Sequence, residues 1–125
     1  MKLENGEIFT GVPALNTLYD MEWPVKVSFA LARLSRKLQE PYKDIEKVKD
    51  GLVRKYGKEN ADSKIELKPE DPNWEKFANE FNELMAQTTE IVFEKIQLPE
   101  EVDGKPVMIK PNLLVPLEKF IEIEE

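Results

Sequence analysis

A stripe of apolar residues over residues 24–57, spaced three and four apart, constrains the fold of this chain more than any other feature. The stripe consists of Val27, Leu31, Leu34, Leu38, Tyr42, Ile45, Val48, Leu52 and Tyr56. Because an α-helix makes one turn in 3.6 residues, this spacing places all these side chains on one face of a long amphipathic helix. Pro24 suits the first position of such a helix, and Gly57 suits its C-terminal end.

The length of the predicted helix conflicts with the size of the chain. At about 1.5 Å per residue the helix would be roughly 50 Å long, whereas a compact domain of this size is only about 30–35 Å across. Either the helix bends or breaks at Pro41, whose ring clashes with the preceding turn, or one end projects from the domain. A projecting end calls for a partner, most simply a second copy, so we expect self-association.

The remaining segments predict a helix-dominated α+β fold in a single domain, residues 1–125. Shorter helices are expected over residues 10–20, 72–87 and 111–120, and the middle one starts behind the N-cap Asp71. A strand is expected over residues 88–98, a hairpin at Asp103-Gly104 and a short strand near 64–68. We therefore expect the long helix to pack on a second helix, with a small antiparallel sheet, a C-terminal helix and a frayed acidic end.

The predicted helix over residues 72–87 has an apolar face rich in aromatic side chains. The face is lined by Trp74, Phe77, Ala78, Phe81, Leu84 and Met85. Aromatic side chains at helical spacing are typical of core packing rather than of a ligand site. We expect this face to form the aromatic centre of the core.

The amino-acid composition excludes most classes of catalytic site. The chain has neither cysteine nor histidine, so thiolate nucleophiles, Cys-based zinc sites and Ser-His-Asp triads are excluded. The five glycines are scattered, which excludes a Gly-rich phosphate loop. A metal site made only of carboxylates, such as Glu80, Glu83, Glu90 and Glu94, is the one enzymatic alternative left open. We expect no catalytic residues, no cofactor and no metal, and a function that depends on binding.

Charge is distributed unevenly along the chain. The net charge is −7, yet residues 24–58 carry ten basic and four acidic residues, and the remainder is strongly acidic. A basic row opposite the apolar stripe, together with neighbouring residues, forms a candidate interaction face of Arg33, Arg36, Lys43, Lys47, Arg54 and Trp23. Its basic row is either a solvated helix face, with Arg36–Glu40 and Asp50–Arg54 pairs, or an anion-binding face for an acidic protein or nucleic acid. The acidic remainder argues against nucleic acid.

Trp23 permits two interpretations of its own. It precedes Pro24 at the mouth of the long helix. It could pack at the edge of the core like a hydrophobic staple, or it could stay exposed as the anchor of an interface.

Localisation signals are not evident in the sequence. The N-terminal MKLENGEIFTG contains no apolar run before a small-residue cleavage site, and no stretch reaches the roughly 20 apolar residues that span a bilayer. We expect a cytoplasmic protein without a membrane partner.

Several segments together resemble a known family. They are the segment from Trp23 to Ala32, the segment from Leu52 to Gly57, the run from Phe77 to Leu84 with Glu90-Ile91, and the closing segment from Leu114 to Ile121. This pattern resembles a family of short proteins encoded by tailed phages and prophages of Gram-positive bacteria.

The resemblance implies a product of the bacterial host cytoplasm, or one associated with the virion, and no catalytic motif. We expect a non-catalytic accessory protein that contacts phage or host proteins during virion assembly or within its structure. The alternatives are an inhibitor of a host defence system, acting as an acidic decoy or ligand sponge, and a carboxylate-only metal-dependent enzyme.

Overall fold

The computed structural model describes residues 2–59, 61–62 and 64–124, and it has the helix-dominated α+β fold that the sequence predicts. The helices are α1 (Asn5–Tyr19), α2 (Val25–Tyr56), α3 (Trp74–Ala86) and α4 (Pro111–Leu114), followed by the 3₁₀ turn η1 (Val115–Leu117). The strands are β1 (Lys2–Glu4), β2 (Lys58–Glu59), β3 (Ile65–Glu66), β4 (Thr88–Glu90), β5 (Ile96–Pro99), β6 (Glu101–Val102), β7 (Lys105–Pro106) and β8 (Ile121–Glu124).

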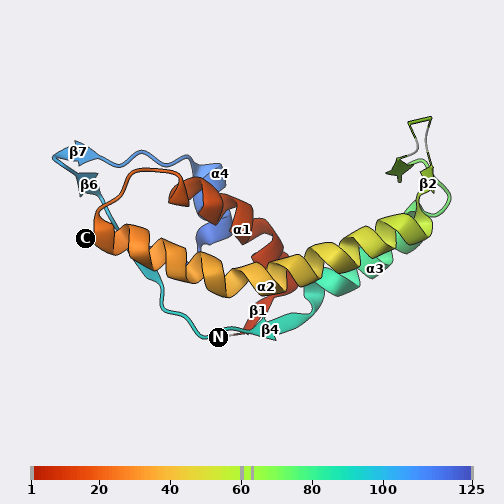
Figure 1. Ribbon diagram of the computed structural model, residues 1–125, viewed down its shortest axis with the longest axis horizontal. Helices are drawn as coiled ribbons and strands as arrows, with labels where there is room; N and C mark the ends of the chain where they lie inside the picture. Colours follow the sequence, from red (N-terminus) through yellow and green to blue (C-terminus); the bar gives the residue numbers. More distant parts are fainter. Residues whose placement is uncertain (1, 60, 63, 125) are drawn as a thin grey trace.

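Helix α2 runs through the whole molecule without a break (Figure 1). Its 32 residues continue through Pro41, which corresponds to a length of about 48 Å. The helix ends at Gly57, whose amide donates a hydrogen bond of 2.7 Å to the Val53 carbonyl. Of the two alternatives posed by the sequence, the structure therefore has a projecting end and not a break at Pro41.

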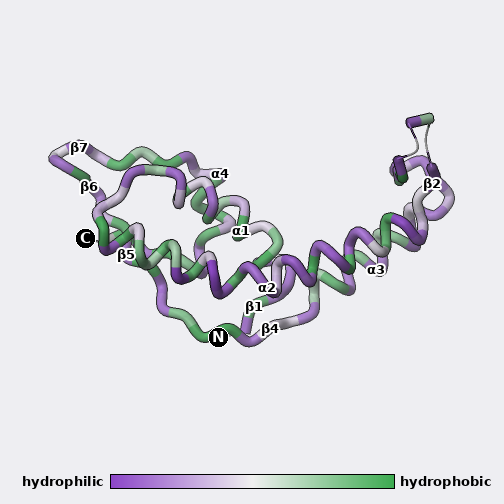
Figure 2. Tube along the Cα trace, in the orientation of Figure 1, coloured by the Kyte–Doolittle hydropathy of each residue, from purple (hydrophilic) through white to green (hydrophobic). Residues whose placement is uncertain are grey.

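The first half of α2 packs on α1 and on the C-terminal segments, and beyond the contacts of Tyr42 and Lys49 with Phe9 of α1 the helix extends away with α3 alongside (Figure 1). The β2–β3 pair sits at the tip of this extension. We call residues 45–56 of α2, together with α3 and the β2–β3 pair, the arm. Hydrophobic and hydrophilic positions alternate along both helices of the arm, as amphipathic packing requires (Figure 2).

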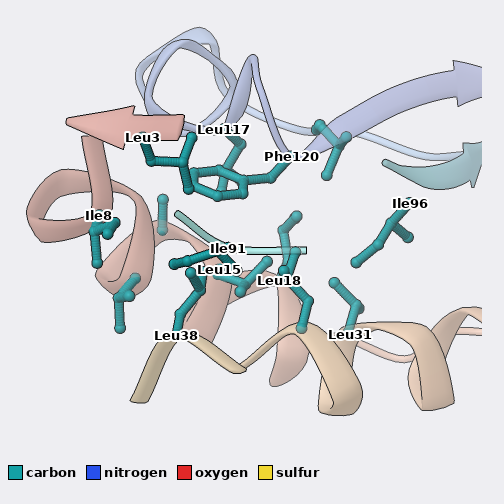
Figure 3. Packing of buried hydrophobic residues seen from close by; sticks show 14 of the residues in the cluster. Leu3, Ile8, Leu15, Leu18, Leu31, Leu38, Ile91, Ile96, Leu117 and Phe120 are labelled. Carbon is teal, nitrogen blue, oxygen red and sulfur yellow. The ribbon is translucent and has the colours of Figure 1, made fainter. Parts of the chain in front are cut away.

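The hydrophobic core lies mostly beside the first half of α2 and extends along the helix as far as Ile45 (Figure 3). Its fully buried side chains are Leu3, Ile8, Leu15, Leu18, Leu31, Leu38, Leu98, Leu117 and Phe120. From the stripe of α2, Val27, Leu34 and Ile45 are also buried, but Val48 in the arm is 49% exposed. The predicted apolar stripe is thus buried where the core packs against α2, and it becomes partly exposed in the arm.

The aromatic face of α3 is not the centre of the core, so that prediction was wrong. Phe77 is the one buried residue of α3, and it lies outside the main cluster. The physical reason is that α3 packs along the outer part of α2, whereas its C-terminal part, from Phe81 to Met85, reaches α1 and the edge of the core. Its rings instead form a chain of contacts, from Trp74 through Phe77 to Phe81 at centroid distances of 5.4 and 5.7 Å.

This chain of rings continues into the core through Phe9. The Phe9 ring lies edge-on to Phe81 at 6.1 Å and stacks on Tyr42 at 6.0 Å. Aromatic pairs at such distances are favourable in both geometries. The arm is therefore joined to the core by packed rings from α1, α2 and α3.

Within residues 2–59, 61–62 and 64–124, the strands form four separate pairs instead of one sheet. The pairs β1–β4, β2–β3 and β6–β7 are antiparallel, whereas β5 and β8 are parallel. The predicted strand over residues 88–98 is split into β4 and β5, and residues 91–95 between them lie in no strand. The predicted hairpin is confirmed, since Asp103 and Gly104 have φ angles of 55° and 78°, as a type I′ turn requires.

Both ends of the chain differ from the prediction. Helix α1 begins at Asn5 and holds Pro13 in its interior, although the sequence suggested a start near residue 10. The helix expected over residues 111–120 ends at Leu114 and tightens into η1, because Pro116 has no amide to continue the helical bonding. Residues 122–124 of the acidic end are not frayed, because β8 pairs with β5 in the register Ile96 opposite Ile121, and Glu125 lies outside the described residues.

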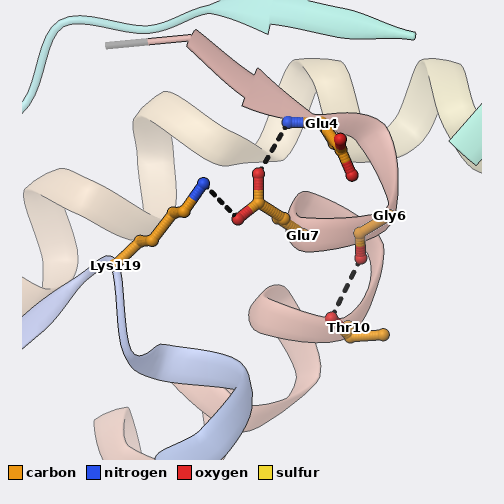
Figure 4. A network of polar contacts seen from close by, with 5 residues as sticks. All are labelled: Glu4, Gly6, Glu7, Thr10 and Lys119. Atoms are coloured by element: carbon orange, nitrogen blue, oxygen red, sulfur yellow. Dashed lines mark hydrogen bonds and ion pairs between the residues drawn. The ribbon is translucent and has the colours of Figure 1, made fainter. Parts of the chain in front are cut away.

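The early start of α1 has a clear local cause (Figure 4). Glu4 and Glu7 form a capping box, in which the Glu4 amide donates to a Glu7 carboxylate oxygen at 2.9 Å. The other Glu7 oxygen accepts from Lys119 Nζ at 2.6 Å. Burial alone would raise the pKa of Glu7, but these hydrogen bonds and the Lys119 charge outweigh it and lower the pKa below its usual 4.5.

Candidate interaction surfaces

The basic residues singled out from the sequence all lie exposed on α2, but as a row and not as a pocket. Arg33, Arg36, Lys43, Lys47 and Arg54 are solvent-exposed. In the part of the chain that the structure describes, no ion pair joins Arg36 to Glu40 or Asp50 to Arg54. The Arg33 guanidinium instead lies 5.7 Å from the centre of the exposed Phe29 ring. The row therefore keeps its charge available to solvent or to a partner.

Trp23 does not join this row. Its indole packs against the core, and its Nε1–H donates a hydrogen bond of 2.8 Å to the Leu18 carbonyl. The side chain thus holds the segment that connects α1 to α2 against the C-terminal end of α1. Of the two sequence interpretations, the structure supports the anchor at the edge of the core.

The arm presents a second surface. Val48 on α2 and Ile65 on β3 are exposed by 49% and 42%. Lys55 on α2 lies 3.7 Å from Glu80 on α3, which pairs the two helices across their outer side. The sequence indicated a long helix packed on a second helix, but it did not indicate that α3 would lie along the projecting part.

A groove lies between α2 and the irregular segment that follows β4. It has a volume of about 650 Å³ and is lined by the cations Lys26, Arg33, Lys37 and Lys95, the carboxylate Glu94, and apolar residues that include Val27, Ala30, Leu34, Phe93 and Ile96. We call it the basic groove. Arg33 is the one residue of the sequence-predicted face that lines it.

The Lys37 side chain spans one end of the basic groove. Its Nζ donates a hydrogen bond of 2.8 Å to the Val92 carbonyl, across the space between α2 and the segment 91–95. On the other side of Lys37 lies a second cavity of about 520 Å³, lined by Glu40, Asp44 and Glu90 as well as by Lys37. The two cavities on either side of Lys37 therefore have opposite charge.

Metal-binding geometry is not formed by the acidic residues considered from the sequence. Within residues 2–59, 61–62 and 64–124, no group of three or more Asp or Glu side chains could hold a metal ion. Glu80 and Glu83 lie on α3, Glu90 lies in β4, and Glu94 lies in the segment after it. None of the helices described is both long enough and apolar enough to cross a membrane.

No protein-family profile matches the chain, and no curated protein or solved structure matches it significantly. The resemblance to short phage proteins therefore stays a prediction from the sequence. Function has to be inferred from the arm, the basic row and the basic groove.

Proposed function

We propose that this protein is a non-catalytic accessory protein that acts through protein–protein contacts, and that its arm associates with the arm of a second copy. The observation that carries the proposal is the arm itself, a two-helix extension beyond the hydrophobic core. The resemblance to short phage proteins extends the proposal to a role in virion assembly or structure, in the cytoplasm of a bacterial host.

The arm has too few layers to bury its own apolar surface. Helix α3 buries only Phe77, and Val48 and Ile65 are 49% and 42% exposed. These apolar side chains are the surface that the second copy would cover. Covering it would stabilise the complex by about 25 cal/mol for each Å² removed from water.

Charge favours a second copy as the partner of the arm. The α2 part of the arm, residues 45–56, carries four basic and two acidic residues, whereas α3 carries three acidic residues and one basic residue. Two arms related by a two-fold axis can place the basic α2 of each copy against the acidic α3 of the other. Such an interface is self-complementary, which is the commonest form of homodimer contact.

Composition supports a role without catalysis. With no imidazole and no thiol, the chain lacks the side chains most often used for general acid–base and nucleophilic chemistry near neutral pH. Shape and surface charge are what it offers to other molecules.

The test is the molar mass in solution, measured by light scattering at tens of micromolar. A dimer would weigh twice the 14.5 kDa of one chain. Val48→Glu, in the arm, should reduce the dimer, because it places a charge in the apolar contact. Val115→Glu is the matched control, since Val115 is 72% exposed on η1, outside the arm. A monomer at all concentrations, or equal loss in both variants, would contradict the proposal.

A further inference from the structure

We infer that the basic groove binds an acidic, extended peptide segment of a partner protein, which adds as a strand beside residues 93–95. The inference rests on the proposed function only in that the protein acts through contacts. It does not require the arm, and it concerns a different face of the molecule.

The charge of the groove selects an acidic occupant. Four cations line it, namely Lys26, Arg33, Lys37 and Lys95, against the single carboxylate of Glu94. This concentration of positive charge stands out in a chain whose net charge is −7. Complementary charge steers a partner to a surface and suppresses wrong partners.

The backbone of the groove wall selects an extended occupant. In the described part of the chain, no backbone amide or carbonyl of Phe93, Glu94 or Lys95 is hydrogen-bonded to another backbone group. The neighbouring strands β4 and β5 do have partners. A peptide that runs alongside could supply the missing hydrogen bonds, which is how strand addition gives affinity.

The apolar residues that form the floor of the groove favour a peptide in which apolar and acidic residues alternate. Val27, Ala30 and Leu34 of α2 form part of the lining, while Val92 at the edge is 78% exposed. In an extended peptide, successive side chains point to opposite sides. Apolar side chains can therefore face the floor, while every second, acidic side chain faces the cations.

The binding test uses a fluorescein-labelled octapeptide of alternating valine and glutamate, followed by fluorescence polarisation. Two control peptides replace glutamate with lysine, or keep the composition in two blocks of four. We expect the alternating acidic peptide to bind at least about tenfold more tightly than either control, since they lack the charge or the alternation. Equal binding of all three peptides, or no binding at millimolar concentration, would overturn the inference.

Matched variants locate the site. Arg33→Glu should weaken binding about fivefold or more, which corresponds to the loss of one exposed ion pair. Arg36→Glu makes the same change in charge one helical turn away, outside the groove, and should leave the affinity within about twofold. Equal effects of the two variants would overturn the assignment to the groove, as would displacement of the peptide by an unstructured DNA oligonucleotide.

Strand addition has its own readout. Hydrogen exchange of alternate amides in this segment, either those of Phe93 and Lys95 or that of Glu94, should slow when the peptide is bound, because successive amides of an extended segment point to opposite sides and one side gains partners. Binding without this protection would overturn the strand geometry. Arg33→Glu should leave the molar mass in solution unchanged, so failure of the groove and failure of the arm can be told apart.

Discussion

Two glycines in helices, Gly11 in α1 and Gly51 in α2, should respond in opposite ways to the same substitution. Alanine is favoured over glycine in a helix interior by about 1 kcal/mol. At Gly51 a Cβ would have no heavy atom within 4 Å. We therefore expect Gly51→Ala to stabilise the protein by about that amount.

At Gly11 the same methyl group enters a packed space. Its Cβ would lie 2.7 Å from Cε2 of Phe120 and 3.4 Å from the Pro116 carbonyl oxygen. The Phe120 ring is 1% exposed and lies 5.5 Å from the Phe93 ring, so it has little room to move away. Overpacking of this kind costs about 1–3 kcal/mol. Both variants gain the same helix propensity, so the difference between their free energies of unfolding equals the overpacking cost at position 11.

Urea unfolding followed by circular dichroism measures this difference directly. Each kcal/mol also corresponds to about 4 °C in Tm for a chain of this size. We predict that Gly11→Ala is less stable than Gly51→Ala by about 1–3 kcal/mol. Equal stabilisation by the two substitutions would refute the close packing of α1 against the C-terminal segment.

Three further predictions concern single side chains. Glu7→Gln should cost about 1 kcal/mol at pH 7 by weakening the cap and removing the Lys119 ion pair. Because folding lowers the pKa of Glu7, this stabilisation is present above its usual pKa of 4.5 and is lost as the pH falls through the lowered pKa. Urea titrations of the variant and the wild type should therefore give the same free energy of unfolding in acid. Trp23→Phe should cost about 1 kcal/mol in thermal unfolding, because the Leu18 carbonyl loses its indole donor. Pro41→Ala should raise the free energy of unfolding by up to about 3 kcal/mol without adding helical ellipticity, and a clear rise in ellipticity would show that α2 is broken in the wild type.

Sequence reasoning found the elements whose signals are local. The stripe from Val27 to Tyr56 fixed α2 to within one residue at each end, and Asp103-Gly104 fixed the hairpin. In each case the periodicity or turn chemistry of neighbouring residues is sufficient to specify the structure.

The sequence did not predict the features that depend on contacts between segments far apart in the chain. The apolar face from Trp74 to Met85 is that of a core helix, and nothing local indicates that α3 packs along the outer part of α2. The parallel pairing of β8 with β5 joins segments 25 residues apart in register, which an acidic tail does not reveal. Arg33 was included in the candidate face, but Lys26, Lys37 and Lys95 were not, because only the path of residues 91–95 brings them into one groove.

The arm exists only if α2 continues unbroken through Pro41, and a distance along this helix tests that most directly. The chain has no cysteine, so spin labels at Val25→Cys and Arg54→Cys would be unique, and both positions are exposed. The 29 intervening steps of a continuous helix predict a separation of about 44 Å between the two backbone positions. Pulsed electron-spin measurements, with labelled protein diluted in unlabelled protein, should give a single distribution near that value. A distribution centred near 30 Å, as a sharp bend at Pro41 would give, would contradict the account.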